Sequence, residues 1–143
     1  MSRVELIFPD PVVFTEQIGL RTTDMSWAGH LGFEKLVGLL QHVQTRFFER
    51  CGLPPGGGRG IGTIVKDLSV VYQGEAHAGD VVSVNVGLGE SGRKWIELYF
   101  QVVRQSTVEV AIAKLAVLCF DYDTGTTVAF PSGVRKALDN GCN

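Results

Sequence analysis

The segment from Asp24 to Gly32 carries the side chains of this sequence best suited to acid–base chemistry. Asp24 and His30 stand on either side of a possible turn that contains Gly29. A carboxylate that orients a histidine lets the imidazole accept a proton from water near neutral pH. Ser26 could hold that water. A structural role is the alternative for Asp24 and Ser26, because both residue types commonly form turns or cap helices in such loops.

Gly32 and Phe33 lie where a long helix is expected to begin. The first turn of a helix presents backbone N–H groups without helical acceptors, and the helix dipole places its positive end there. Such donors can stabilise an oxyanion. Gly32 has no side chain to obstruct an approaching carbonyl group. Alternatively, Gly29 and Gly32 only shape the turn.

Four further residues are candidates for binding a substrate. Arg93 and Lys94 follow a glycine turn and suit phosphate oxygens, although an exposed hairpin pair is often merely solvated. His42, near the edge of the apolar stripe, is either a partly buried histidine with a backbone or water partner or part of the substrate site. Asp67 lies inside an expected strand, where it is exposed to solvent, paired with a lysine or arginine, or part of the wall of a binding site.

The elements that must position these residues follow from apolar periodicity. Residues 31–49 repeat apolar side chains at helical spacing, and Gly52 with Pro54-Pro55 ends that helix. A short helix is expected within 131–139. Strand patterns are expected at 12–22, 61–73, 80–88, 93–105 and 108–122. Short connections require antiparallel neighbours, so we predict an α+β fold in which a five-stranded antiparallel sheet wraps around one long central helix.

The order of these elements, with the segment Asp24-Met25-Ser26-Trp27-Ala28-Gly29-His30-Leu31-Gly32 at the first junction, resembles hot-dog-fold thioesterases. The nearest resemblance is to the 4-hydroxybenzoyl-CoA thioesterase-like branch. The helix exit Cys51-Gly52-Leu53-Pro54-Pro55, the strand entry Gly79-Asp80-Val81-Val82 and the pair Arg93-Lys94 resemble the same branch. One hot-dog domain over residues 1–143 is therefore expected, with a core at about 12–122 and a C-terminal tail at 123–143.

The resemblance implies hydrolysis of an acyl-CoA thioester by activated water, with coenzyme A as part of the substrate and no resident cofactor. Asp24 matches the first acidic position of the family loop, and Arg93 and Lys94 match its coenzyme-binding pair. Ser26 stands where the branch usually has its second acid, and Gly32 and Phe33 replace two asparagines.

That difference leaves a second reading open, a non-catalytic module that binds acyl thioesters or only assembles with partners. A dehydratase-like lyase is a weaker option, because its arrangement of histidine and acid is not visible. The resemblance also implies homodimers or homotetramers with sites at subunit interfaces.

Composition excludes several classes of function and location. The chain has 143 residues, 13 basic and 15 acidic side chains and a net charge of −2, which argues against nucleic-acid binding. No apolar run approaches the length of a membrane span. Three scattered cysteines and no ligand cluster predict free thiols, no metal and a cytoplasmic location. A mean hydropathy of +0.16 favours self-association.

Overall fold

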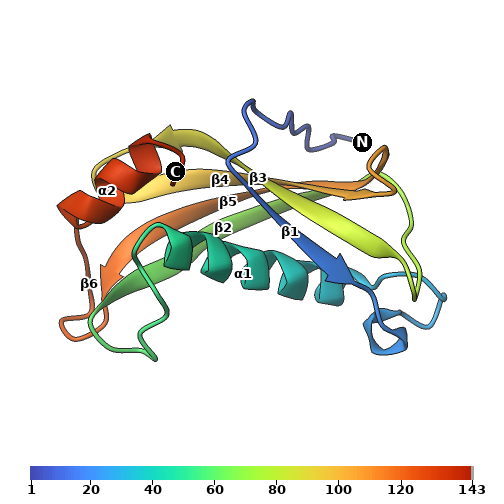
Figure 1. Cartoon of the computed structure of the whole chain (residues 1–143), viewed down its shortest axis with the longest axis horizontal. Helices are drawn as coiled ribbons and strands as arrows, with labels where there is room; N and C mark the ends of the chain where they lie inside the picture. Colours follow the sequence, from blue (N-terminus) through green and yellow to red (C-terminus); the bar gives the residue numbers. More distant parts are fainter. Residues whose placement is uncertain (143) are drawn as a thin grey trace.

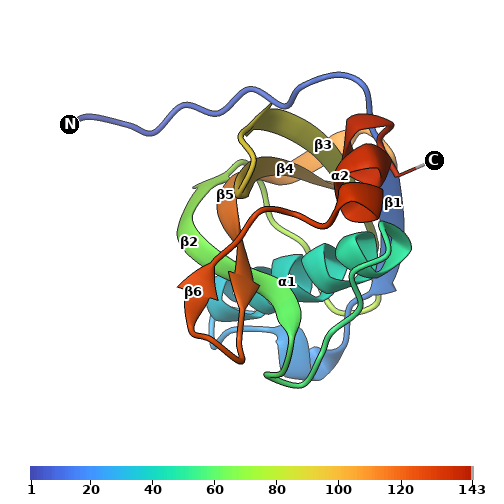
Figure 2. The same ribbon diagram turned by 90° about the vertical axis from the view of Figure 1, so that its left-hand side faces the viewer.

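The computed structural model describes residues 1–142, which form an antiparallel sheet curved around one long helix (Figures 1 and 2). The strands run in the spatial order β1-β3-β4-β5-β2, and the short β6 pairs with β5. This confirms the predicted α+β hot-dog fold. The bounds are β1 Phe14–Gly19, β2 Ile61–Tyr72, β3 Val81–Ser91, β4 Trp95–Arg104, β5 Val108–Asp121, β6 Thr126–Thr127, α1 Phe33–Arg50 and α2 Ser132–Asp139.

Helix α1 begins two residues later than its apolar pattern predicted. Gly32 is its N-cap and has extended dihedrals, with φ −72° and ψ 148°. Leu31 belongs to the loop, where it forms an isolated bridge to Met25. At the other end Gly52 has a φ of 92°, a left-handed conformation that suits glycine and ends the helix. The start of α1 is therefore set by the loop rather than by hydrophobic spacing.

The core lies between α1 and the concave face of the sheet. Helix α1 buries one stripe, and β3 and β4 bury alternate residues against it. The buried set includes Leu36, Leu40, Val43, Phe47, Val82, Val84, Val86, Leu98, Phe100 and Val102. These side chains remove a continuous apolar surface from water, which is the main stabilising term of such a fold. The arrangement holds both ends of α1 at fixed positions relative to the sheet.

Two strand boundaries differ from the predictions. The first strand was expected to reach residue 22, but a 3₁₀ turn at Thr22–Asp24 follows β1. The third strand was expected to end at residue 88, but β3 continues through an irregularity to Ser91, which pairs with Ile96. Gly89 makes this extension possible, since a Cβ there would come within 2.7 Å of Tyr99. The hairpin turn therefore falls at 92–94, next to the basic pair.

Strand β2 is one edge of the sheet, and it is more exposed than an inner strand. Its neighbour on one side is β5, and no strand of residues 1–142 covers its other side. Ile64, Val65 and Leu68 on this strand are 39%, 44% and 37% exposed. An edge with unpaired backbone groups and apolar side chains is a surface on which another strand can pair.

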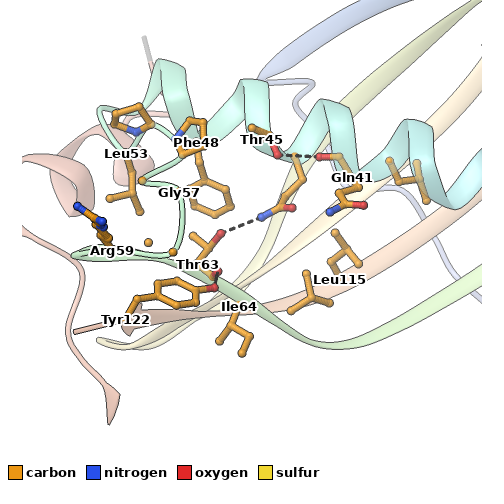
Figure 3. A pocket seen from close by; sticks show the side chains of 18 of the residues that line it. Gln41, Thr45, Phe48, Leu53, Gly57, Arg59, Thr63, Ile64, Leu115 and Tyr122 are labelled. Atoms are coloured by element: carbon orange, nitrogen blue, oxygen red, sulfur yellow. Dashed lines mark hydrogen bonds between the residues drawn. The ribbon is translucent and has the colours of Figure 1, made fainter. Parts of the chain in front are cut away.

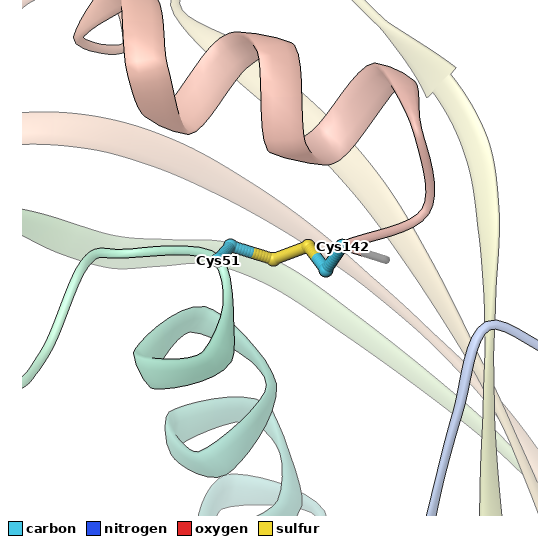
Figure 4. The surroundings of a disulfide bond; sticks show 2 residues. All are labelled: Cys51 and Cys142. Carbon is cyan, nitrogen blue, oxygen red and sulfur yellow. A yellow bond between two sulfur atoms is a disulfide. The ribbon is translucent and has the colours of Figure 1, made fainter.

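The expectation of three free thiols is wrong. Cys51, the C-cap of α1, forms a disulfide bond with Cys142 beyond α2 (Figure 4). Only Cys119 is free among the described cysteines, and burial raises the pKa of its thiol. Sequence spacing could not indicate this bond, because its two cysteines are 91 residues apart and meet only in the folded chain. The residues after 122 also join the core, where Phe130, Val134 and Leu138 are buried.

Candidate active site

The predicted loop residues line a cavity of about 940 Å³ beside the start of α1, which we call the loop cavity. Its walls come from the β1–α1 loop, the first turn of α1 and the end of β2. They comprise Met25, Ser26, Trp27, Ala28, His30, Leu31, Gly32, Phe33, Glu34, Lys35, Tyr72, Gly74 and Glu75. Ser26, His30, Gly32 and Phe33 are therefore brought together, as the sequence led us to expect, while Asp24 is not among the lining residues.

Hydrogen bonds inside the loop hold its shape. The backbone N–H of Ser26 donates to the His30 carbonyl oxygen at 2.8 Å, and Gly29 donates back to Ser26 at 3.0 Å. Gly29 has a φ of 83°, so the turn needs a residue that tolerates the left-handed region. The Ser26 hydroxyl accepts the N–H of Ala28 at 3.2 Å. Ser26 therefore serves the turn, and its role in holding water stays a prediction.

The Asp24 carboxylate is buried and turned toward Arg21. It accepts the backbone N–H of Arg21 at 2.8 Å and lies 3.5 Å from the Arg21 guanidinium. The Arg21 backbone bond, more than the guanidinium, holds the pKa of Asp24 below its usual value, although burial opposes this. No hydrogen bond joins Asp24 to His30 within residues 1–142. The carboxylate instead organises the loop, whose Gly32 N–H donates to the Asp24 carbonyl oxygen at 3.1 Å.

His30 keeps one ring nitrogen available. Its Nδ1 lies 3.3 Å from the carbonyl oxygen of Leu31, an acceptor that favours the tautomer with a proton on Nδ1. The Nε2 atom then carries the free lone pair. His30 is half-buried and lines the loop cavity, so this lone pair can act on a molecule bound there.

The first turn of α1 supplies uncommitted backbone donors. The Gly32 N–H is occupied by Asp24, so it is not one of the free donors that the sequence suggested. No side chain caps the helix start, and the N–H groups of Phe33, Glu34 and Lys35 have no helical acceptor. A Cβ at Gly32 would come no closer than 3.6 Å to other atoms, so the glycine is not required for packing.

The cavity also contains polar groups that the sequence did not single out. Glu34 and Glu75 are the carboxylates among its lining residues, and Tyr72 brings a phenol whose pKa is raised by burial. Glu75 lies in the β2–β3 connection, and its Oε2 is 3.5 Å from Nε2 of His77. The Leu31 N–H donates to Ala76 at 2.8 Å and fixes this connection against the loop. Nothing local in the sequence points to this contact between residues far apart in the chain.

A second cavity, of about 580 Å³, lies farther along α1, and we call it the helix cavity (Figure 3). Apolar side chains such as Val37, Phe48, Leu53 and Leu115 line it together with the glycine-rich loop and Arg59. The buried Gln44 donates to the Thr63 hydroxyl at 3.1 Å, and the Tyr122 hydroxyl donates to the Thr63 carbonyl oxygen at 2.6 Å. Mid-helix positions facing this cavity therefore carry amides and a hydroxyl, not a carboxylate.

All four predicted binding residues lie outside both cavities. His42 is exposed, and its Nε2 lies 3.8 Å from a carboxylate oxygen of Glu16 on β1. Asp67 is exposed at the irregularity of the edge strand β2. Neither lines the loop cavity or the helix cavity. Their predicted roles remain predictions.

The basic pair Arg93-Lys94 lies at the opposite end of α1 from the loop cavity. It sits in the β3–β4 hairpin, where the carbonyl oxygen of Arg93 accepts the N–H of Phe130 at 3.0 Å. The segment after Phe130 forms α2 (Figure 1), and the disulfide ties α2 to the end of α1 (Figure 4). At 1.5 Å per residue, α1 alone spans roughly 27 Å. One protomer therefore does not bring the basic pair to His30.

Neither helix in the described part of the chain is long and apolar enough to cross a membrane. Within residues 1–142, no group of three or more His, Cys, Asp or Glu side chains is placed to hold a metal ion.

Solved structures with the same fold cover nearly the whole chain. A 1,4-dihydroxy-2-naphthoyl-CoA thioesterase from Synechocystis is 14% identical, with a TM-score of 0.79 over 89% of this chain and 96% of that one. A Staphylococcus aureus protein in complex with CoA is 15% identical, with a TM-score of 0.85 over 98% and 88%. A gentisyl-coenzyme A thioesterase is 17% identical, with a TM-score of 0.78 over 87% and 98%.

Curated protein sequences contain no match. A family model does match, that of the thioesterase-like superfamily, and it covers residues 20–138, from the end of β1 into α2. Because this match spans most of the sequence, including the loop, α1 and the basic pair, the chain belongs to the thioesterase-like superfamily.

Proposed function

We propose that the protein hydrolyses an acyl-CoA thioester in the loop cavity. The observation that carries this proposal is the uncapped start of α1 opening on the same cavity as His30. The thioester carbonyl oxygen faces the N–H groups of the first turn, and His30 Nε2 accepts a proton from the attacking water. The tetrahedral intermediate then collapses, the C–S bond breaks, and the coenzyme leaves as a thiol after receiving that proton.

Asp24 supports this reaction by shaping the loop. Its carboxylate holds Arg21 and its carbonyl oxygen holds Gly32, so the two ends of the loop meet at one residue. In this proposal His30 contacts the water, whereas Asp24 positions His30 and the helix start. No resident cofactor takes part, since water and the coenzyme of the substrate supply all reacting groups.

We propose further that the working unit is a homodimer, or a homotetramer built from such dimers. Antiparallel pairing of two β2 edges about Asp67 would place Tyr72 of one protomer near the partner's Ile61. This pairing reverses the partner, so that its helix cavity and its basic pair approach the loop cavity. The partner's Arg93 and Lys94 would bind coenzyme phosphates, and the apolar helix cavity would receive the acyl or aryl group.

The names of solved structures with this fold support a class of substrate. Two solved structures of this fold are named as thioesterases of hydroxyaryl-CoA esters, and another contains CoA. We propose an acyl-CoA small molecule as the substrate and no nucleic acid or membrane as partner. A cytoplasmic location remains a proposal, and the Cys51–Cys142 bond removes the support that cysteine usage had lent it.

A non-catalytic acyl-thioester-binding or assembly module is the second candidate. Ser26 at the position of the usual acid favours it, because this side chain accepts a backbone bond and contributes no carboxylate to the cavity. Tight binding of a CoA ester without turnover would support this candidate. Gain of activity in Ser26→Asp would then identify the site as a degenerate one.

The deciding experiment offers the purified protein a panel of aliphatic and aromatic acyl-CoA esters and follows the released thiol. We expect at least one ester to be hydrolysed, and His30→Ala to lower kcat by about 10²-fold or more. His42→Ala is the matched control, because His42 faces β1 outside both cavities. Absence of hydrolysis above background for every ester, or full activity in His30→Ala, would contradict the proposal.

A further inference from the structure

The C-terminal helix α2 is hydrogen-bonded to the hairpin that carries the basic pair. The Arg135 guanidinium donates to the carbonyl oxygen of Gly92 at 2.8 Å and to the hydroxyl of Ser91 at 2.7 Å. Asp139, one turn later on α2, holds the same guanidinium at 2.9 Å. The hairpin turn preceding Arg93 is therefore fixed by one side chain of α2, and that side chain is itself held in place.

The backbone on the other side of the pair is also held by the C-terminal segment. Phe130 donates its N–H to the Arg93 carbonyl oxygen, and its ring stacks on Phe48 at 6.3 Å between centroids. Phe48 and its neighbour Leu53 line the helix cavity. One segment, residues 130–142, thus supports both the basic pair and a wall of the helix cavity.

The disulfide attaches the far end of this segment covalently to α1. Helix α2 has eight residues and buries Val134 and Leu138. A helix of this length is not stable alone, so it needs its contacts with the rest of the chain. The bond from Cys142 to Cys51 anchors the far end of α2 to the C-cap of α1 (Figure 4). Without it, the packing of α2, the Arg135 bonds and the contacts of Phe130 hold the segment.

We propose that the Cys51–Cys142 bond is a redox-sensitive latch that holds α2 against the Arg93–Lys94 hairpin, with Arg135 as the positioning residue. The role of the hairpin in coenzyme binding rests on the proposed function. The latch itself rests on the bonds between α2, the hairpin and α1. Because this bond ties α2 to the C-cap of α1, breaking it would loosen the attachment of the hairpin that carries the basic pair.

The chemistry of release is thiol–disulfide exchange with a dithiol reductant. A thiolate of the reductant attacks one Sγ, the Sγ–Sγ bond breaks, and the other cysteine leaves as a thiolate. The second thiol of the reductant then displaces the first cysteine and closes a disulfide within the reductant. Two electrons pass to the protein, and the protons of the two reductant thiols end on Cys51 and Cys142. Because both cysteines are buried, local opening of α2 must precede the attack.

The test compares the full chain before and after treatment with dithiothreitol. Alkylation under denaturing conditions counts the thiols, with one expected before reduction and three after. Hydrogen exchange is measured on peptides covering residues 89–95 and 130–142, and steady-state kinetics on an acyl-CoA ester that the panel identifies. Cys142→Ala is the matched variant, since it lacks the latch in either redox state.

We expect reduction to accelerate exchange in both peptides and to raise KM about tenfold, with kcat changed much less because the hairpin is proposed to bind the coenzyme phosphates and not the reacting carbonyl group. Arg135→Gln should accelerate exchange at 89–95 in the oxidised protein. Cys142→Ala should resemble the reduced protein and ignore dithiothreitol. Three thiols in the untreated protein, or unchanged exchange on reduction, would overturn the latch. If no ester is hydrolysed, the proposed function fails, and the exchange data still decide the latch.

Discussion

The oxyanion role of the helix start can be tested by removing one backbone N–H. Phe33 is the first residue of α1, a position where proline is well tolerated because its missing N–H has no helical acceptor. The preceding Gly32 already has a ψ of 148°, in the range that a following proline requires. Phe33→Pro therefore deletes one donor at the loop cavity while leaving the helix intact.

The size of the effect follows from the donor that is lost. Removal of one oxyanion donor costs about 3–4 kcal/mol of transition-state stabilisation, which lowers kcat by about 10²–10³. Phe33→Ala is the control, since it removes the same ring, which is 72% exposed, and keeps the N–H. The two variants should unfold in urea within about 1 kcal/mol of each other, because proline here also restricts the unfolded chain.

The assay is the ratio of kcat between Phe33→Ala and Phe33→Pro on one acyl-CoA ester, with urea denaturation of both proteins alongside. We expect a ratio of about 10² or more at nearly equal stability. Equal rates in the two variants would refute the Phe33 N–H as the oxyanion donor. A slow Phe33→Pro that is also strongly destabilised would refute the argument that the helix start accepts proline.

Three further predictions concern the loop cavity and the β2 edge. Asp24→Asn should lose about 1–2 kcal/mol of unfolding free energy near neutral pH. Because the folded pKa of Asp24 is lowered, the stabilisation by its carboxylate is present above the unfolded pKa near 3.9 and is lost as pH falls through the folded pKa. The unfolding free energies of the two proteins, measured by urea denaturation, should therefore converge in acid. Glu75→Gln should keep its turnover within about threefold if His30 is the base, and a loss of about 10² or more would assign proton transfer to Glu75 instead. Leu68→Lys, at the exposed edge of β2, should shift the protein toward monomers in light scattering, and an unchanged mass would contradict pairing through this strand.

Much of the fold was predictable because its signals are local. The helical spacing of Leu36, Leu40, Val43 and Phe47 predicts the long helix, and period-two alternation predicts β3 and β4. Short turns between strands require antiparallel neighbours, which narrows the topology. The boundaries were less predictable: the helix begins at Phe33, not at the apolar Leu31, because a bridge and the bonds of Asp24 hold Leu31 and Gly32 in the loop.

The candidate site also contains some features that were predictable from the sequence and others that were not. The loop motif placed Ser26, His30, Gly32 and Phe33 at one cavity, because neighbours in a short loop cannot lie far apart. The direction of the Asp24 carboxylate was not predictable, since Arg21 and His30 lie on either side of it within one loop and only the folded turn selects Arg21. The contribution of Glu75 to the same cavity depends on a contact between the β2–β3 connection and Leu31, which no local pattern records.

The class of the fold, the long helix and the loop that precedes it follow from the sequence alone, because these features depend on periodicity and on residues close together in the chain. The edge position of β2, the helix length that separates the basic pair from His30, and the meeting of Cys51 with Cys142 become visible only in the folded chain. These facts depend on strand order and on the path of the chain between distant residues. Local spacing carries no information about either.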